Sequence, residues 1–171
     1  SSAIVTLALG DALAAALMDA RQFVAADFAR LHPAGQLGRN LLTTVGEIMH
    51  KADAIALVAP DCALREVLIE MGKFKQGAAC VVDENRQLLG IITDGDVRRA
   101  LLEHEDIRAL KATDVMTQEP IRTHPTSSLG QAVQLMEDRP MQISVLPVTP
   151  PDNNECLGLI RIHDIYQPSL D

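Results

Sequence analysis

The chain is 171 residues long and 47% hydrophobic, so it can bury a sizeable core as one ordinary domain or as two small ones. Its 15 basic and 23 acidic residues give a formal net charge of −8 at pH 7, which disfavours nucleic acid and anionic membrane as partners. Aromatic residues make up 2% and Trp is absent, so the chain also lacks the stacking platforms that bind single-stranded nucleic acid.

Three cysteines, Cys62, Cys80 and Cys156, lie far apart and show no metal-binding spacing, so we expect no metal site. We interpret them as reduced core cysteines of a cytoplasmic protein. Asp11 and Asp19 interrupt the most apolar segment, and we therefore expect no stretch that can span a bilayer. The first residues lack the basic start of a signal peptide and an initiator Met, and we expect a longer parent chain upstream.

The first part of the chain predicts two helices. Residues 4–21 are apolar almost all round, so this helix needs cover from an upstream segment or from another subunit. A shorter helix is expected at about 25–31, because Pro33 disfavours helix in the residue before it, and residues 33–38 predict a turn. His32 then lies at a helix end, where an imidazole either does chemical work or, more commonly, interacts with the helix dipole.

From about residue 46 the chain repeats itself at an offset of about 65–68 residues, and such repeats reveal the architecture. The matching segments are Glu47-Ile48-Met49 with Asp114-Val115-Met116, Leu64 to Val67 with Leu129 to Val133, and Gly90-Ile91-Ile92 with Gly158-Leu159-Ile160.

Each copy predicts a strand, a helix, two buried strands and a closing helix. The expected elements are 55–58, 64–74, 79–82 and 88–92 in the first copy, and 121–123, 129–138, 143–148 and 158–160 in the second. Residues 83–86 predict a hairpin turn between two of these strands. One copy has too little core to be stable alone, so we expect the two to pack face to face and to bring their strand-to-helix turns near a shared cleft.

The most informative segment is the strand-to-helix turn within residues 90–101. Thr93 ends the strand and Asp96 follows in the first helical turn, so a hydroxyl and a carboxylate face one small volume beside free backbone N–H groups. Such a pair suits a ribose diol, with a phosphate on the N–H groups. The alternative is that Thr93 or Asp94 simply caps the helix, and the local pattern alone favours the cap.

The doubled order of elements, with Gly-apolar-apolar-Thr-x-x-Asp closing the first copy, resembles a tandem pair of cystathionine-β-synthase (CBS) domains. The resemblance covers about residues 45–167. It implies an α+β fold in which two β-α-β-β-α motifs pack as a pseudo-twofold pair, preceded by helices left over from another domain. The CBS domains would span residues 45–108 and 109–171.

The resemblance to CBS pairs also implies a ligand, typically an adenosine nucleotide such as AMP or ATP. Thr93 would position its phosphate or ribose, Asp96 would accept the ribose hydroxyls, and Ala78 and Ala79 would lie against the base. No cofactor would be required.

The second copy departs from the CBS pattern. It keeps the carboxylate as Asp164 but has Arg161 where the family has Thr or Ser. Arg161 could pair with a ligand phosphate or carboxylate, fill the site, or point to solvent. We interpret this second site as degenerate or as altered in ligand preference.

Residues 1–44 carry a resemblance of their own. The segments Leu7 to Ala14, Asp27-Phe28-Ala29 and His32 to Arg39 look like the C-terminal end of a sugar isomerase (SIS) domain. A SIS end followed by a CBS pair resembles the arabinose-5-phosphate isomerases, which convert D-ribulose 5-phosphate to D-arabinose 5-phosphate. This reaction supplies 3-deoxy-D-manno-octulosonate (Kdo) for lipopolysaccharide. His32 matches the family's active-site histidine, whose expected role is proton transfer.

Two departures bear on activity. Ala34 replaces a glycine of the family's His-Pro-Gly-Gly segment, and the Ser/Gly loops that would hold a sugar phosphate are absent from this sequence. We therefore expect the chain alone to be inactive and His32 to act only in the full-length assembly. We also expect self-association through the CBS pair, as a dimer and, in the parent enzyme, as a tetramer.

Three functions follow from the sequence. The first is a regulatory module that binds a nucleotide, or a nucleotide sugar such as the pathway product CMP-Kdo. The second is a structural dimerisation module with no small-molecule ligand, in which Thr93 and Asp96 are caps. The third, an enzyme in its own right, has little support, because no nucleophile with an adjacent base and no phosphate-binding loop is evident.

Overall fold

The computed structural model describes residues 2–24, 27 and 36–166. The chain forms two compact units, Ser1–Thr43 and Thr44–Asp171. His32 and the helix expected at about 25–31 lie outside the described residues, apart from the helical residue Asp27.

The first unit contains α1 (Ser2–Ala20) and α3 (Gln36–Leu42). The expected apolar helix at 4–21 is confirmed within two residues, and its apolar side chains are exposed. The turn predicted for 33–38 is wrong from Gln36 onward, where α3 begins. Leu37 and Leu41 have the i, i+4 spacing of a helix, and a single glycine such as Gly38 is tolerated within one.

By length and composition alone, α1 is long and apolar enough to cross a membrane. The expectation that no stretch meets this test is therefore wrong, because Asp11 and Asp19 do not lower the mean hydropathy of the segment far enough. One such helix near the start of a chain is weak evidence for a membrane, since core helices of soluble proteins pass the same test.

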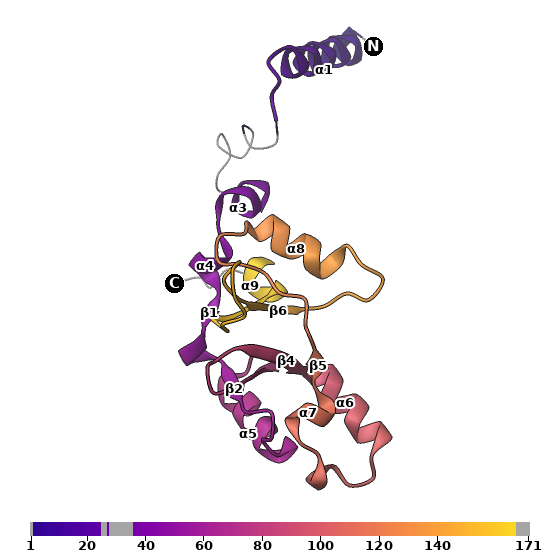
Figure 1. Ribbon diagram of the computed structural model, residues 1–171. Coiled ribbons are helices and arrows are strands. Elements are labelled where there is room, and N and C mark those ends of the chain that lie inside the picture. Colours follow the sequence, from indigo (N-terminus) through magenta and orange to yellow (C-terminus); the bar gives the residue numbers. More distant parts are fainter. Residues whose placement is uncertain (1, 25–26, 28–35, 167–171) are drawn as a thin grey trace. The chain divides into compact units, whose positions relative to one another are not determined.

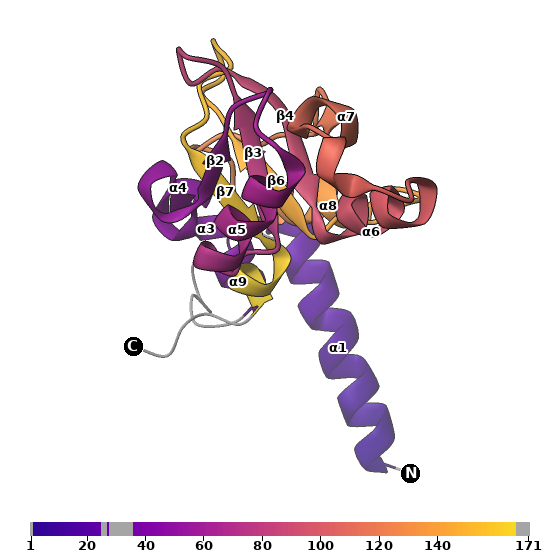
Figure 2. The same cartoon turned by 90° about the horizontal axis from the view of Figure 1, so that it is seen from below.

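The second unit contains two α+β motifs, each a sheet with its helices (Figures 1 and 2). The first motif has the sheet order β2-β3-β4-β5, with only β2 and β3 parallel. The second has the antiparallel order β1-β7-β6. The elements of the first motif are β2 (Ala56–Val58), α5 (Leu64–Phe74), β3 (Ala78–Val82), β4 (Leu88–Thr93), α6 (Asp94–Glu103) and β5 (Thr117–Gln118). Those of the second are β1 (His50–Lys51), α8 (Leu129–Glu137), β6 (Val145–Val148), β7 (Gly158–Arg161) and α9 (Ile162–Tyr166).

Short helices connect these elements. They are α4 (Val45–Ile48), α7 (Ala112–Val115) and the 3-10 turns η1 (Ala52–Ala54) and η2 (Ile107–Ala109).

The two motifs exchange their linker strands. β1 precedes the first motif in sequence but pairs with β7 of the second, and β5 precedes the second motif but pairs with β4 of the first. Gly90 and Gly158 allow this exchange, because a Cβ at Gly90 would lie 2.9 Å from Thr117 O and one at Gly158 would collide with His50 O. The sheet of each motif is thereby completed by the short strand that precedes the other motif in sequence.

Three apolar clusters form the core of this unit. One lies between the first sheet and helices α5 and α6, and another lies between the second sheet and helices α8 and α9. The third joins the two sheets, with Cys80 and Ile91 from the first motif and Cys156 and Leu159 from the second. The predicted face-to-face packing is confirmed, and each large side chain buried there stabilises the pair by ~1.5–3 kcal/mol.

The expected elements of the repeat are largely confirmed, including helix 64–74 and the hairpin at 83–86, where Asp83 Oδ1 accepts hydrogen bonds from Asn85 N and Gln87 N at 2.8 Å. The strand expected at 121–123 is wrong, since only Thr123 makes a bridge, to Val148. Pro147 in the neighbouring strand has no N–H to donate, which shortens this ladder.

The three cysteines are free thiols. Cys80 and Cys156 are core residues, as expected, whereas Cys62 is only partly buried at the edge of the first cluster.

Candidate functional site

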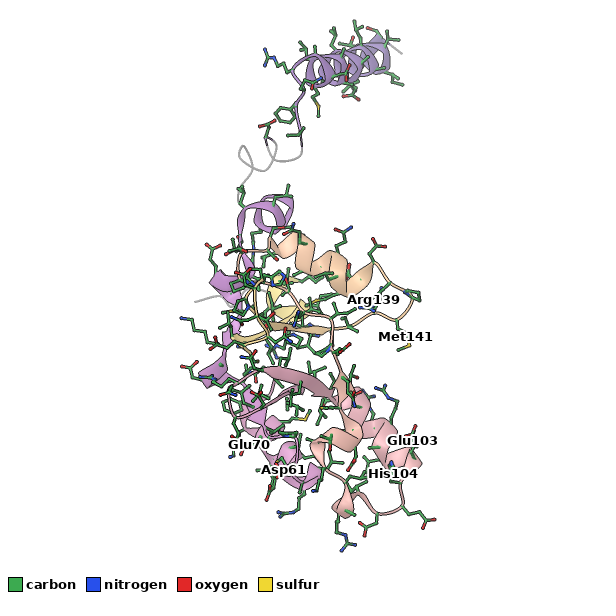
Figure 3. The ribbon with its side chains drawn as sticks, in the orientation of Figure 1. Asp61, Glu70, Glu103, His104, Arg139 and Met141 are labelled. Atoms are coloured by element: carbon green, nitrogen blue, oxygen red, sulfur yellow. The ribbon has the colours of Figure 1, made fainter. Side chains whose placement is uncertain are left out.

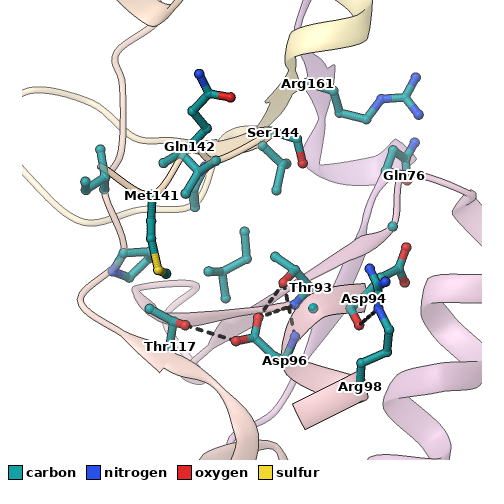
Figure 4. A pocket seen from close by; sticks show the side chains of 18 of the residues that line it. Gln76, Thr93, Asp94, Asp96, Arg98, Thr117, Met141, Gln142, Ser144 and Arg161 are labelled. Carbon is teal, nitrogen blue, oxygen red and sulfur yellow. Dashed lines mark hydrogen bonds between the residues drawn. The ribbon is translucent and has the colours of Figure 1, made fainter. Parts of the chain in front are cut away.

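A cavity of about 670 Å³ lies between the two motifs, within the range of small-ligand pockets. The first motif lines it mainly with the turn between β4 and α6, and the second with the loop between α8 and β6 (Figures 3 and 4). Its lining residues include Gln76, Gly77, Thr93, Asp94, Gly95, Asp96, Arg98, Arg99, Thr117, Glu119, Arg139, Met141, Ser144, Arg161 and His163.

The turn at residues 93–96, here the first turn, joins Thr93 and Asp96 in a reciprocal cap of α6. Asp96 Oδ2 accepts hydrogen bonds from Thr93 N at 2.7 Å and from Thr93 Oγ1 at 2.6 Å, and Asp96 N donates to Thr93 Oγ1 at 3.4 Å. Both residues line the cavity, so the sequence-predicted pair is brought together beside an opening (Figure 4).

The second carboxylate oxygen of Asp96, Oδ1, also has partners within the protein. Thr117 Oγ1 donates to Asp96 Oδ1 at 3.2 Å, and the guanidinium of Arg99 forms an ion pair with the same oxygen. The carboxylate is only 4% exposed. Its lone pairs are therefore used within the protein, and Thr93 is the more available member of the pair.

Ala78 and Ala79 are buried in the core and are not among the residues that line the cavity. They pair with Thr93 and Ile92 across the β3–β4 ladder, between the apolar layers. The cavity wall next to them is formed by Gln76 and Gly77.

The turn at residues 161–164, here the second turn, is built differently. Asp164 accepts hydrogen bonds from Arg161 Nε at 2.9 Å and Arg161 Nη2 at 2.6 Å, and His50 Nε2 lies 2.9 Å from Asp164 Oδ2. Arg161 Nη1 also donates to Lys75 O at 3.4 Å, in the first motif. Arg161 thus ties the second turn to the other motif, and its side chain also lines the cavity.

The charges of the second turn shift two pKa values. Burial alone would raise the pKa of Asp164, but the hydrogen bonds and charge of Arg161, with a smaller contribution from His50, hold it below its usual value. The hydrogen bond to Asp164 raises the pKa of the Arg161 guanidinium. His163 lines the cavity beside this pair.

Sequence reasoning missed Gln76, Arg98, Arg139 and Met141 as cavity residues. Arg139 and Met141 lie on the loop after α8 (Figure 3), and Met141 is 76% exposed. The repeat was the available signal, because it places the segment before the second strand pair opposite the first turn. Within the described residues, no group of three or more His, Cys, Asp or Glu side chains is placed to hold a metal ion.

The sequence profile of the CBS domain matches residues 45–103 and 112–168. The chain belongs to the CBS-domain family. Solved structures with the same fold include the CBS-pair protein CBSX2 from Arabidopsis thaliana, at 21% identity and a TM-score of 0.60 over 72% of this chain and 91% of that one. The CBS pair of MJ0100, in complex with 5-methylthioadenosine and S-adenosyl-L-methionine, has 23% identity and a TM-score of 0.63 over 72% and 93%.

Curated relatives extend the similarity through the first unit. The chain is 41% identical over 170 residues to arabinose 5-phosphate isomerase KdsD of Escherichia coli K12, and equally so to that of Pseudomonas aeruginosa PAO1. The match covers 99% of this chain and 51% of each relative, so the chain spans about half the length of the relatives it matches. The resemblance to a CBS pair of this isomerase family is thereby confirmed.

Proposed function

We propose that this chain is the regulatory ligand-binding part of a D-arabinose 5-phosphate isomerase of Kdo biosynthesis. The identity of 41% across both units supports the parent enzyme. Residues 1–44 would end the SIS domain, and residues 45–108 and 109–171 would form the CBS pair. His32 would transfer a proton in the complete active site, and the chain alone would be inactive.

We infer that the cavity between the motifs binds a nucleotide or a nucleotide sugar. The observation that carries this inference is the 670 Å³ cavity beside the Thr93–Asp96 pair, lined by polar groups of both motifs. Adenine compounds are a reasonable class, because the CBSX2 complex contains AMP and the MJ0100 complex two adenosine derivatives. CMP-Kdo is the alternative, as feedback by a pathway product.

The roles of the first turn follow from its hydrogen bonds. Thr93 Oγ1 donates its proton to Asp96 Oδ2 and accepts from Asp96 N, so its remaining lone pair would accept a hydrogen bond from a ribose hydroxyl. Contact with a ligand phosphate would require the Thr93 proton to turn away from Asp96. A ribose hydroxyl at Asp96 would have to replace Thr117 or Arg99, since both carboxylate oxygens already accept bonds. Ala78 and Ala79 would support the base only from behind Gly77, and Arg161 and Asp164 would serve the second motif without a separate ligand.

The ligand would act by favouring one packing of the two motifs over another, which requires a different affinity for the two states. The exchanged strands β1 and β5 couple the motifs, so a change in their packing would be transmitted through these strands to the rest of the assembly. We further propose self-association through the CBS pair, no required cofactor, and a cytoplasmic location, where sugar phosphates and nucleotides are made.

Calorimetry of the 171-residue chain with AMP, ATP and CMP-Kdo tests this function. Saturable heat with at least one of them is expected, together with a change in isomerase activity when the same compound is added to the full-length enzyme. An isomerase assay of the chain alone should show no turnover of D-ribulose 5-phosphate.

A second candidate is a structural dimerisation module with no ligand. The specific observation in its favour is that Asp96 is 4% exposed and that both of its oxygens are already bonded within the protein, one in the cap of α6 and the other to Thr117 and Arg99. This function predicts no heat with any nucleotide, and a loss of dimer rather than of regulation when the CBS pair is altered.

A further inference from the structure

Two buried polar atoms on cavity-lining residues are without a hydrogen-bond partner in the part of the chain that the structure describes. They are Gln76 Oε1, from the loop before β3 in the first motif, and Arg139 Nε, from the loop after α8 in the second. Buried polar groups are nearly always satisfied, so such atoms point to a missing partner. Here the two residues line one cavity from different motifs, and a side-chain rotation would bring either atom to the cavity surface.

The two atoms require opposite hydrogen-bonding partners, a donor for Gln76 Oε1 and an acceptor for Arg139 Nε. Gln76 Nε2 donates to Ala54 O at 2.9 Å, and this bond orients the amide and leaves Oε1 as an acceptor. Arg139 Nε is a donor on a permanently charged group. The complementary ligand therefore carries an N–H or O–H donor at one end and an anionic oxygen at the other.

The other charges of the cavity favour Arg139 as the anion site. Arg99 is paired with Asp96 and Arg161 with Asp164. Arg98 donates only to the neutral carbonyl Asp94 O, at 3.3 Å, but it is exposed, so water solvates its charge. The acidic lining residues Asp94 and Glu119 are exposed and stay hydrated, whereas Arg139 Nε is withdrawn from water. A buried guanidinium donor gains more from an oxyanion than an exposed one does.

Resting on the proposed function, we propose that Arg139 is a specificity residue that selects phosphorylated ligands, while Gln76 accepts a hydrogen bond from an uncharged part of the same molecule. The ligand then bridges the motifs, with its acidic group on the second and its neutral donor on the first. Nucleoside phosphates fit this pattern, and unphosphorylated nucleosides satisfy only the Gln76 end.

The test compares AMP with adenosine and CMP with cytidine, by calorimetry on the full 171-residue chain. The wild-type chain should bind the phosphorylated member of a pair about tenfold or more tightly, the gain expected of a charge-assisted hydrogen bond. Arg139→Gln should abolish this difference and leave nucleoside affinity unchanged. Gln76→Leu should weaken nucleoside and nucleotide alike.

A matched control is Arg122→Gln, because Arg122 contacts Asn154 and is not among the cavity-lining residues. It should leave all affinities unchanged, and thermal unfolding checks that each variant is folded. Inorganic pyrophosphate provides a probe without a nucleoside, and its binding should be weakened by Arg139→Gln only.

The outcomes separate this inference from the function on which it rests. Equal binding of nucleotides and nucleosides, or pyrophosphate binding indifferent to Arg139→Gln, would overturn the anion site while nucleotide binding stands. Pyrophosphate binding that depends on Arg139, without any nucleotide or nucleoside binding, would support the anion site and refute the proposed function.

Discussion

The two strand-to-helix turns occupy equivalent positions in the repeat, yet they use their carboxylates differently. In the first turn Asp96 is buried. It accepts hydrogen bonds from Thr93 and Thr117 and forms an ion pair with Arg99, and all three partners lie in its own sheet or next to it. In the second turn Asp164 is more exposed, and it forms hydrogen bonds with Arg161 and His50.

A single residue accounts for much of the difference. Thr93 is short and leaves room at the end of its strand, where the cavity opens. Arg161, its counterpart, is long, and its guanidinium donates hydrogen bonds to Asp164 and to Lys75 O of the first motif. The repeat therefore preserves the fold at both turns. We propose that only the first turn binds a ligand, and we expect one ligand per chain.

The largest expected effect comes from the glycines that admit the exchanged strands. Gly158→Ala should lower the free energy of unfolding by about 3 kcal/mol, because the new methyl collides with the backbone at His50 O. Gly90→Ala should cost less, about 1–2 kcal/mol, because its backbone obstacle, Thr117 O at 2.9 Å, overlaps less than His50 O does at Gly158, and its nearest obstacle, at 2.6 Å, is the movable side chain of Met116. Urea unfolding measures both, and equal costs would refute the difference in packing.

The next effect separates the two carboxylates. Asp96→Ala should lower the free energy of unfolding by about 2–3 kcal/mol, because it leaves buried donors unsatisfied. Asp164→Ala should cost about 1 kcal/mol, because its side chain is 18% exposed and water can replace it. If Asp164→Ala lowers the free energy of unfolding more than Asp96→Ala does, the second turn contributes more to stability than the first, contrary to this expectation.

Thr93→Ala tests whether the first turn is more than a cap. Loss of the cap alone should reduce stability by about 1 kcal/mol. Because Thr93 also lines the cavity, we expect nucleotide affinity to fall at least tenfold in the same variant. The matched control is Ser128→Ala at the cap of α8, which should lower stability similarly and leave affinity unchanged. Unchanged affinity in Thr93→Ala would favour the purely structural module.

The smallest effect is a pH dependence at the second turn. The folded-state pKa of Asp164 lies below its ordinary value, so its stabilising contribution is complete above the unfolded pKa of about 4. This contribution is lost as the pH falls through that value and then through the lower folded pKa.

The stability gap between wild type and Asp164→Asn should therefore narrow between about pH 5 and pH 3. Urea unfolding across this range measures it, with Asp61→Asn as an exposed control. A gap that stays constant would show that the ionised carboxylate does not contribute.

Much of the fold could be predicted because the sequence states it twice. The segments at 64–74 and 129–138 have the same helical spacing, and each is followed by buried strands, so a weak pattern in one copy is supported by the other. The exchanged strands β1 and β5 could not be predicted, because two residues are too few to show the alternation of a strand.

The site was only partly predictable. Thr93 and Asp96 are three residues apart in one turn, so local geometry brings them together. Ala78 and Ala79 lie in a strand that is buried on both faces, where no alternation tells which side meets a cavity. Gln76 and Arg139 lie on loops of different motifs, and whether both line one cavity depends on how the motifs pack.

The central claim is that the cavity beside Thr93 is the ligand site of the pair. Amide chemical shifts of the 171-residue chain, followed during titration with AMP and then CMP-Kdo, test it most directly. We predict saturable shifts at Gly77, Gly95 and Ser144, on both motifs and with one ligand per chain. Shifts confined to residues that do not line this cavity, or no shifts with either compound, would contradict the account.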